Sequence, residues 1–399
     1  MKILQVSHKY PFPPKDGGAI AMLNLADGFA RARHEVSLLA MKTPKHGGRS
    51  ITLETGTAYL DIYSVFVDTS IKPFRLLANL LFSRIPYNAE RFINREFREK
   101  LIEILHGTSF DIIQLEGLYL MPYADTIRRF SKAKISLRSH NIEHEIWKRI
   151  AQQASHKLAK PYYNILARRM EAFETSFINR YDLLVPISGR DYNFYTRLGN
   201  TKPSCVIPVG MDTSVKYTPA RFPEKKTLLF IGSLDYIPNQ EGLIWFIENV
   251  WKKFPHAFHD CLFYIAGRNA PLQLKKYLNR QPVKYVGEVD DAFRFMHSGG
   301  VMVVPLLSGG GIRVRIIEAM ALGIPVVTTS IGAEGLDVSD GSNILIADDP
   351  EVFSNAVTRL LENQSFFASM GKNARLFIEE KMDSSVLASQ LLKFYRHNR

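Results

Sequence analysis

The stretch that decides the fold spans residues 301–330 and reads VMVVPLLSGGGIRVRIIEAMALGIPVVTTS. An apolar run that ends at Pro305 predicts a buried strand, and the apolar spacing across residues 312–323 predicts a helix that begins near Ile312. A second apolar run, residues 324–328, predicts the next strand. A strand, a glycine-rich loop, a helix and a strand in this order are typical of a parallel α/β sheet.

The same alternation continues on both sides of this stretch. In the first half of the chain, short apolar runs predict the strands Lys2–Ser7, Glu35–Ala40, Ile112–Leu115, Lys134–Arg138 and Leu183–Pro186. In the second half, they predict Leu228–Ile231, Leu262–Ala266, Lys284–Val286, Val301–Pro305, Pro325–Thr328 and Asn343–Ala347. Longer patterns with a period near 3.6 residues, such as residues 19–32, predict the helices between them.

The predicted class is therefore α/β, with two doubly wound domains. Residues 1–212 form the first domain, and residues 213–226 are polar, contain prolines and lack a period, as expected of a linker. Residues 227–380 form the second domain, and residues 381–399 predict a final helix. Because such sheets bind ligands beyond the carboxyl ends of their strands, we expect a ligand cleft between the two domains.

The glycine-rich loop carries the strongest chemical signal. Gly309, Gly310 and Gly311 allow the backbone to approach a phosphate closely, and the start of the helix offers free N–H groups. We expect Arg313 and Arg315 to lie in the first helical turn. Two cations there disfavour the helix itself, which indicates that an anion binds at this position.

Glu318 lies three residues after Arg315, on nearly the same helical face. A carboxylate at this place commonly accepts hydrogen bonds from ribose hydroxyls. The spacing also fits an ordinary α/β turn in which Glu318 only pairs with Arg315. The P-loop pattern is absent, which argues against a P-loop nucleotidase.

Composition narrows the class further. Of 399 residues, 46% are hydrophobic and 23% charged, as in ordinary globular domains. Two cysteines, Cys205 and Cys261, do not make a disulfide framework and predict buried thiols in a reducing compartment. The chain opens on an apolar strand rather than a secretory signal, and it lacks a run of 18 apolar residues that could span a membrane.

The net charge of +12 is concentrated in one half of the chain. Residues 1–205 hold 30 Lys and Arg against 19 Asp and Glu, whereas the remainder holds 21 against 20. A basic field of this kind indicates an anionic partner. Residues 72–100 mix Lys and Arg with apolar residues at helical spacing, which suits an anionic membrane surface as well as an ordinary solvated helix pair.

The motif P-x-x-x-G-G-G-x-R-x-R-x-x-E-A-M-A-x-G-x-P-V-V-x-T resembles the donor-site motif of the retaining GT-B glycosyltransferases of family 4, and the similarity extends over nearly the whole chain. This resemblance implies two facing Rossmann-like domains, with the final helix crossing back to the first domain. It also implies that Arg313 and Arg315 bind the donor diphosphate and that Glu318 binds the ribose. Many members carry a second glutamate where this chain has Gly310.

Other segments match the family more locally. The Gly17-Gly18 pair after the first strand resembles the loop that faces the donor phosphates, although a plain helix start fits it equally well. His140, after the strand 134–138, matches the histidine beside the donor sugar, and we expect it to be catalytic. Gly210 in VIPVGMD and Ser233 in LFIGSLD match donor-side positions, the latter where many members carry a cation. We reject a metal site at His140 and His144.

The resemblance implies a glycosyltransferase that moves a sugar from a nucleotide-diphosphate donor to a hydroxyl of a glycan or lipid-linked glycan. No metal or other cofactor is expected, and no nucleic-acid partner. We expect a cytoplasmic protein that associates peripherally with the inner face of the membrane. A nucleotide-sugar epimerase on the same fold is one alternative. A non-catalytic nucleotide-sugar binding protein is another, motivated by Gly310.

Overall fold

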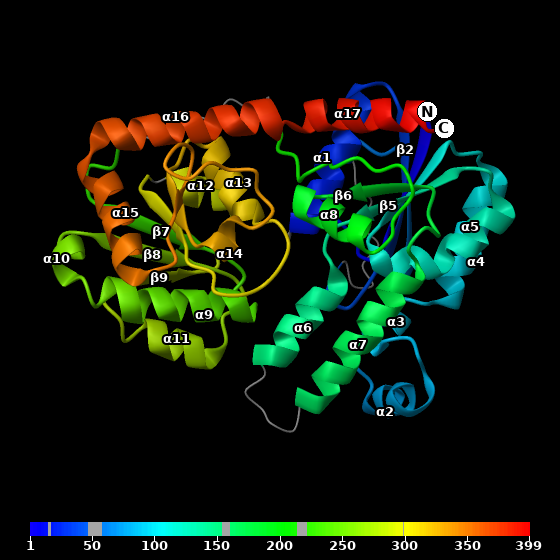
Figure 1. The fold of residues 1–399 in the computed structure, drawn as a ribbon, viewed down its shortest axis with the longest axis horizontal. Coiled ribbons are helices and arrows are strands. Elements are labelled where there is room, and N and C mark those ends of the chain that lie inside the picture. Colours follow the sequence, from blue (N-terminus) through cyan, green and yellow to red (C-terminus); the bar gives the residue numbers. More distant parts are fainter. Residues whose placement is uncertain (15–16, 47–57, 154–159, 214–221, 298) are drawn as a thin grey trace. The chain divides into compact units, whose positions relative to one another are not determined.

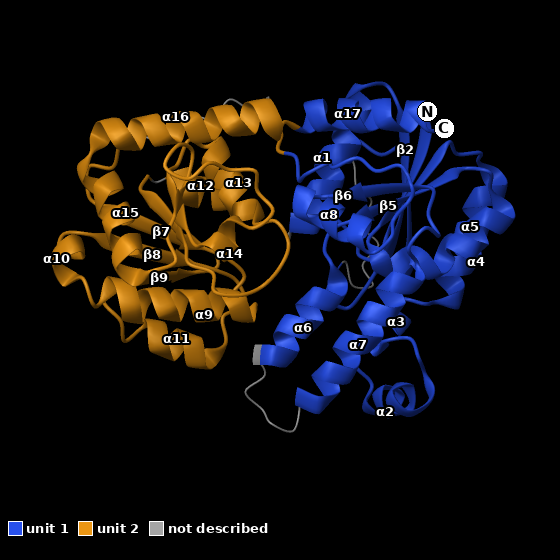
Figure 2. Ribbon diagram, in the orientation of Figure 1, with its two compact units in different colours: residues 1–210, 384–399 blue, residues 211–383 orange. Residues whose placement is uncertain are grey.

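The computed structural model describes the chain except for residues 15–16, 47–57, 154–159, 214–221 and 298. The chain forms two compact units, coloured separately in Figure 2. Unit 1 comprises Met1–Gly210 and Ser384–Arg399, and unit 2 comprises Met211–Asp383. Most of the expected linker, residues 214–221, lies outside the described residues, and its described ends belong to unit 2.

The described part of unit 1 contains a six-stranded sheet in the order β3-β2-β1-β4-β5-β6, and all its pairings are parallel. Its strands are β1 (Lys2–Ser7), β2 (Glu35–Lys42), β3 (Asp61–Phe66), β4 (Ile112–Glu116), β5 (Lys134–Ser139) and β6 (Leu183–Pro186). β1 is central, because Ile3 lies opposite both Val36 of β2 and Ile112 of β4.

Helices connect these strands and cover the sheet (Figure 1). They are α1 (Gly17–Arg31), α2 (Pro73–Phe82), α3 (Tyr87–Glu90), α4 (Arg95–Gly107), η1 (Leu118–Tyr123), α5 (Ala124–Phe130), α6 (Glu143–Gln153), α7 (Lys160–Ser176), α8 (Gly189–Arg197) and α17 (Ser384–His397). Figure 1 shows α6 and α7 side by side, and the two helices contact each other closely.

The final helix is an integral part of unit 1. α17 packs along α1 so tightly that a Cβ atom at Gly28 would lie 2.5 Å from the Cβ atom of Ala388. Tyr395 of α17 is buried, and its hydroxyl donates to Gln114 Oε1 at 2.7 Å and contacts Ser136 Oγ at 2.9 Å. The last residues of the chain therefore support the middle strands of the first sheet.

Unit 2 repeats the architecture. Its described residues form a six-stranded parallel sheet in the order β12-β11-β10-β7-β8-β9. The strands are β7 (Thr227–Ile231), β8 (Leu262–Ala266), β9 (Lys284–Gly287), β10 (Val301–Val304), β11 (Val326–Thr328) and β12 (Leu345–Ile346). The helical segments are α9 (Ile237–Trp245), η2 (Phe246–Trp251), α10 (Pro255–Phe258), α11 (Leu272–Leu278), α12 (Ala292–His297), α13 (Val314–Ala321), α14 (Ser330–Ala333), α15 (Pro350–Glu362) and α16 (Gln364–Lys381).

The predicted α/β class with two parallel sheets is confirmed. The sequence prediction missed β3, an edge strand none of whose residues is fully buried, so that it lacks a continuous apolar run. The predicted start of the motif helix near Ile312 is also wrong. α13 begins at Val314, and Arg313 is its N-cap with φ −84° and ψ 86° rather than a residue of the first turn. Gly311, with φ +80°, keeps the chain out of a helical conformation just before this point.

No helix in the described part of the chain is both long enough and apolar enough to cross a membrane.

Candidate functional site

The loop between β10 and α13 depends on glycine for its shape. Gly309 and Gly311 have φ values of +101° and +80°, in the region that side chains disfavour. A Cβ atom at Gly309 would lie 2.7 Å from the hydroxyl oxygen of Tyr236, which belongs to the loop after β7. Ser308 of the glycine-rich loop donates a hydrogen bond from its Oγ to Oε2 of Glu241, a residue of α9, at 3.1 Å. The two loops are therefore fitted against each other without space for larger side chains.

These two loops leave the sheet at its topological switch point. β7 and β10 are neighbours in the sheet, and the chain order proceeds outward from them in opposite directions. Open α/β sheets bind ligands beyond the carboxyl ends of the strands at this place. Ser233 and the glycine loop 309–311 thus lie at the position in unit 2 that is best suited to a ligand.

Arg313 and Arg315 differ in their contacts. The Nη1 atom of Arg313 donates to the carbonyl oxygen of Gly310 and, at 2.5 Å, to that of Gly311, so this side chain braces the loop. Arg315 Nη1 donates to Glu318 Oε2 at 2.6 Å. The ion pair allowed by the sequence spacing is therefore formed. It leaves a guanidinium with further N–H donors beside the loop, because arginine carries five.

Glu318 is buried, with only 2% of its surface exposed. Burial raises the pKa of its carboxyl, while the adjacent Arg315 guanidinium acts in the opposite direction. Only one of its two oxygens is engaged by Arg315 in the structure. The other keeps its capacity to accept hydrogen bonds.

Ser233 has polar partners from two loops. Its hydroxyl donates to Asp235 Oδ1 at 2.5 Å and accepts from Arg268 Nε at 3.2 Å. Arg268 follows β8, so it supplies a cation at the carboxyl edge where the sequence prediction had found none after β7. A contact between residues 35 positions apart carries no local sequence signal.

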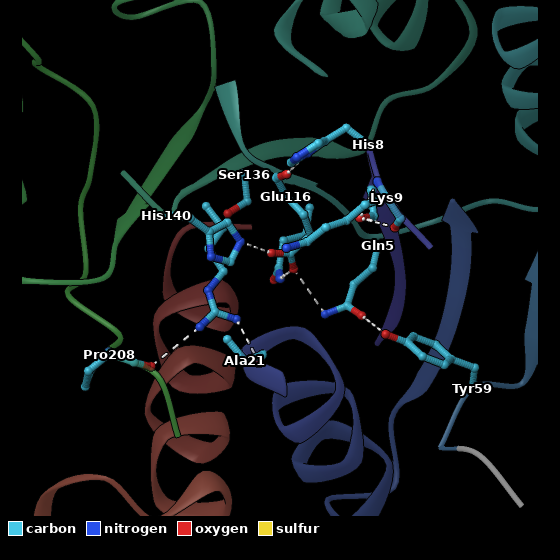
Figure 3. Close-up of polar contacts among 12 residues, drawn as sticks. Gln5, His8, Lys9, Ala21, Tyr59, Glu116, Ser136, His140 and Pro208 are labelled. Carbon is cyan, nitrogen blue, oxygen red and sulfur yellow. Dashed lines mark hydrogen bonds and ion pairs between the residues drawn. The ribbon is translucent and has the colours of Figure 1, made fainter. Parts of the chain in front are cut away.

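In unit 1, His140 directly follows β5 and faces a buried carboxylate. Its Nε2 atom lies 2.6 Å from Oε2 of Glu116, the last residue of β4. The other oxygen of Glu116 accepts from Gln114 at 2.5 Å and from Gln5 at 3.4 Å. Gln5 in turn accepts from the Tyr59 hydroxyl at 2.6 Å. Figure 3 shows Gln5, Glu116 and His140 turned toward one another.

The protonation of this pair follows from its surroundings. Burial alone would raise the pKa of Glu116, but the hydrogen bond from His140 and the charge of the buried Arg138 outweigh it and lower that pKa. Burial lowers the pKa of His140, and together with the charges of Arg138 and Lys9 it outweighs the opposing effect of Glu116. Glu116 is thus ionised and His140 neutral, with the proton on Nε2 donated to the carboxylate. The Nδ1 atom is then left as a hydrogen-bond acceptor.

Gly17, Gly18 and Gly210 are the remaining predicted site residues of unit 1. Gly17 and Gly18 are the first two residues of α1 and are half-buried. The carbonyl oxygen of Gly210 accepts from Asn24 Nδ2 at 2.8 Å, and a Cβ atom there would lie 3.0 Å from Ser384 Cα. Close packing against the start of α17 therefore explains this glycine. A donor contact at these three positions stays a prediction.

His144 does not share a cluster with His140. Its Nδ1 atom lies 2.7 Å from Oε2 of the buried Glu174. Among the residues that the structure describes, no group of three His, Cys, Asp or Glu side chains is placed to hold a metal ion.

Family comparisons agree with this geometry. Residues 15–215 match the model described as Glycosyltransferase Family 4, and residues 225–363 match the model described as Glycosyl transferases group 1. The chain belongs to glycosyltransferase family 4. It is thus a transferase by family, as its glycine motif predicted.

Individual relatives are distant. An uncharacterized 44.6 kDa protein in the cps region of Klebsiella pneumoniae is 25% identical over 403 residues, covering 98% of this chain and 99% of that protein. A phosphatidyl-myo-inositol mannosyltransferase of Mycobacterium leprae is 28% identical over 179 residues, 43% of this chain and 46% of that one.

Solved structures share the GT-B fold. Sucrose-phosphate synthase from Thermosynechococcus elongatus superposes with a TM-score of 0.71 at 17% identity, and the superposition covers 100% of this chain and 99% of the synthase chain. Anabaena HepE in complex with UDP gives a TM-score of 0.70 at 17% identity and covers both chains fully, at 100% each. At these identities the likeness shows the fold alone.

The hydrogen bond between His140 and Glu116 makes a prediction about the histidine. The substitution Glu116→Gln removes the negative charge that raises the pKa of His140, so we expect that pKa to fall further below its ordinary value. The amide oxygen that this substitution introduces can still accept from Nε2–H, so the tautomer should persist. A pH titration of the ¹⁵N-labelled imidazoles by NMR measures both quantities. Glu103→Gln, an exposed carboxyl on α4, is the control. An unchanged or higher pKa of His140 in Glu116→Gln would show that the pair is not formed.

Proposed function

We propose that this protein transfers a sugar, with retention of anomeric configuration, from a nucleotide-diphosphate donor to a hydroxyl of a glycan or lipid-linked glycan. Membership of family 4 supports a sugar transferase. The observation that carries the donor assignment is the glycine loop 309–311 at the switch point of the second sheet, with Arg313 and Arg315 beside it.

The glycine loop and the first residues of α13 each have a defined role in donor binding in this proposal. Backbone N–H groups of 309–311 and the Arg315 guanidinium bind the diphosphate, while Arg313 holds the loop in shape and adds positive charge. Glu318 accepts hydrogen bonds from the ribose hydroxyls through its second carboxylate oxygen. In the reaction the bond between the anomeric carbon and the phosphate oxygen breaks, and the acceptor oxygen bonds to that carbon while its hydroxyl proton passes to the departing diphosphate. Arginine neutralises the charge that develops on the departing diphosphate, so we expect no metal requirement.

His140 has a separate role in the proposal. As a neutral imidazole fixed by Glu116, it offers an unprotonated Nδ1 to a sugar hydroxyl and supports the partial charge at the anomeric centre. Gly17, Gly18, Gly210 and Ser233 are proposed as further donor contacts. HepE was solved with UDP and with UDP-glucose, which makes UDP-sugars the first donors to test on this chain.

The donor site predicts a pattern of binding losses. Arg315→Ala should weaken UDP binding about 10- to 100-fold, since a charge-assisted hydrogen bond contributes about 1.5–3 kcal/mol. Arg313→Ala should also weaken UDP binding, because the loop loses the side chain that braces it and a positive charge. Glu318→Gln should weaken UDP binding without weakening inorganic diphosphate binding, because Glu318 contacts only the nucleoside part of UDP in this proposal and its carboxylate partly neutralises Arg315. Isothermal titration calorimetry measures these affinities, with GDP as a parallel ligand. Arg280→Ala, an exposed arginine of unit 2, is the control.

Affinities that are unchanged in all three variants would refute the site assignment. Incubations with UDP-sugars, first alone and then with a panel of acceptors, test the two alternative functions. Epimerised nucleotide sugar without an acceptor would favour an epimerase, and binding without hydrolysis or transfer across an acceptor panel would favour a non-catalytic binding protein.

We further propose that unit 1 places the protein at an anionic membrane surface, as a peripheral cytoplasmic protein. On α2, the side chains of Phe74 and Phe82 are 90% and 87% exposed. Lys72 and Arg75, both exposed, flank Phe74 in the sequence. Arg169 of α7 donates to the carbonyl oxygen of Leu80 at 2.7 Å, so α2 is held against the unit with its apolar side outward. Exposed aromatic side chains with flanking cations suit an anionic bilayer.

The double substitution Phe74→Ser/Phe82→Ser should reduce co-sedimentation with phosphatidylglycerol vesicles at least about tenfold, because each buried Phe contributes about 1.5–3 kcal/mol. Binding of the wild type should weaken with added salt and be low on phosphatidylcholine. Leu272→Ser, an exposed apolar residue of unit 2, is the control. Wild-type protein that stays in the supernatant at low salt would contradict membrane association.

A further inference from the structure

Three aromatic rings meet beside His140 in unit 1. Phe92 and Tyr119 are stacked, with ring centroids 5.2 Å apart and an interplanar angle of 27°. His8 contacts both rings edge-on, at centroid distances of 5.2 Å to Phe92 and 5.6 Å to Tyr119. All three side chains are half-buried, so each keeps part of its surface in contact with solvent.

The rings lie where the first sheet is expected to bind a ligand. In its strand order, the switch point falls between β1 and β4. His8 directly follows β1, and Tyr119 lies in η1, directly after β4. The two loops are tied together, because His8 Nδ1 lies 3.0 Å from the carbonyl oxygen of Glu116. Gly117 lies against the His8 ring, and its φ of +107° is in the region that side chains disfavour, which explains glycine at this position.

His8 is neutral in this position. Burial lowers its pKa to about 3, and the neighbouring Lys9 acts in the same direction. The carbonyl oxygen of Glu116 can only accept a hydrogen bond, so the imidazole proton belongs on Nδ1 of His8, and Nε2 is an acceptor. The cluster therefore offers ring surface together with an uncharged hydrogen-bonding atom.

A carboxyl group completes the cluster. The Tyr119 hydroxyl donates to Glu143 Oε2 at 2.7 Å, and Glu143 opens α6 just three residues after His140. Its side chain is half-buried, and burial raises its pKa to about 7, although the hydrogen bonds from Tyr119 and Asn141 act against this rise. A carboxylate has about four acceptor positions, so Tyr119 and Asn141 leave capacity for further hydroxyl groups.

Partly exposed aromatic rings beside a carboxylate match the two sides of a sugar. The C–H face of a pyranose packs on an aromatic ring, while its hydroxyls donate to carboxylate and imidazole acceptors. Buried charged groups alone would not recognise the apolar face, and rings alone would not orient the hydroxyls. We propose that His8, Phe92, Tyr119 and Glu143 form a pyranose-binding subsite for the sugar of the acceptor. This assignment rests on the proposed transferase function.

Saturation-transfer-difference NMR on the full chain tests the subsite without knowledge of the natural acceptor. The probes are the α- and β-methyl glycosides of glucose, galactose, mannose and N-acetylglucosamine, with irradiation of aromatic protein resonances. At least one glycoside should show saturation transfer in the wild type. Phe92→Ala and Glu143→Gln should each weaken its binding about tenfold, because each removes one of the two recognition elements.

The controls distinguish a lost contact from a lost fold. Tyr192→Ala removes an exposed ring from α8 and Glu103→Gln an exposed carboxyl from α4, and both should bind the glycoside as the wild type does. Glu143→Gln is nearly isosteric and serves if Phe92→Ala melts early. UDP binding, measured on the same samples, should be unchanged in Phe92→Ala and Glu143→Gln.

Two results would overturn the subsite. One is the absence of saturation transfer from every glycoside in the wild type, and the other is equal binding by the wild type and Glu143→Gln. Loss of UDP binding in Glu143→Gln would place the residue in the donor site and also refute an acceptor role. Glycoside binding by a wild type that binds no nucleotide would instead refute the proposed transferase function while the sugar subsite stands.

Discussion

The close approach of two loops in unit 2 is the constraint on which the donor side depends. A Cβ atom at Gly309 would collide with the Tyr236 hydroxyl at 2.7 Å, and one at Gly242 would lie 2.2 Å from the carbonyl oxygen of Pro305. Any side chain is thus excluded at Gly309 and at Gly242, beyond the carboxyl ends of the neighbouring strands β7 and β10. The glycine loop 309–311 is partly exposed at this edge of the sheet, and the helix that follows it starts only at Val314.

The late start of α13 changes what the two arginines do. As the N-cap, Arg313 can turn back and donate to the carbonyl oxygens of Gly310 and Gly311, which a first-turn residue pointing along the helix could not do as easily. Arg315 projects from the helix itself and pairs with the buried Glu318. One arginine shapes the loop and the other remains beside it with donors to spare, so the two are not interchangeable.

In unit 1 the candidate catalytic residue is positioned differently, by polar side chains buried within the sheet. Gln5, Gln114 and Glu116 are all fully or almost fully buried on neighbouring strands, and Tyr395 of the final helix completes the network through Gln114. Buried polar groups are costly unless they are paired, so this network holds Glu116 in one position and thereby orients His140. The fold and the candidate catalytic group are stabilised by the same hydrogen bonds.

Much of this arrangement could be predicted from sequence, because strands such as residues 228–231 and 262–266 are continuous apolar runs. β3 could not, since an edge strand needs no such run. His140 was found through the family motif, but its partner Glu116 lies 24 residues away, and only the alternation of Gln114 and Glu116 within an apolar strand could have signalled it. Arg268 and Glu143 could not be singled out from sequence. Arg268 is placed by its contact with Ser233 and Glu143 by its contact with Tyr119, and no local sequence pattern encodes either contact.

In the proposed function, the backbone of the β10–α13 loop binds the diphosphate of a sugar donor. Hydrogen–deuterium exchange of the full chain, measured by mass spectrometry with and without a panel of nucleotide sugars, tests it directly. At least one nucleotide sugar should slow amide exchange in residues 306–318. Absence of protection there with every nucleotide sugar, or protection confined to other parts of unit 2, would contradict it.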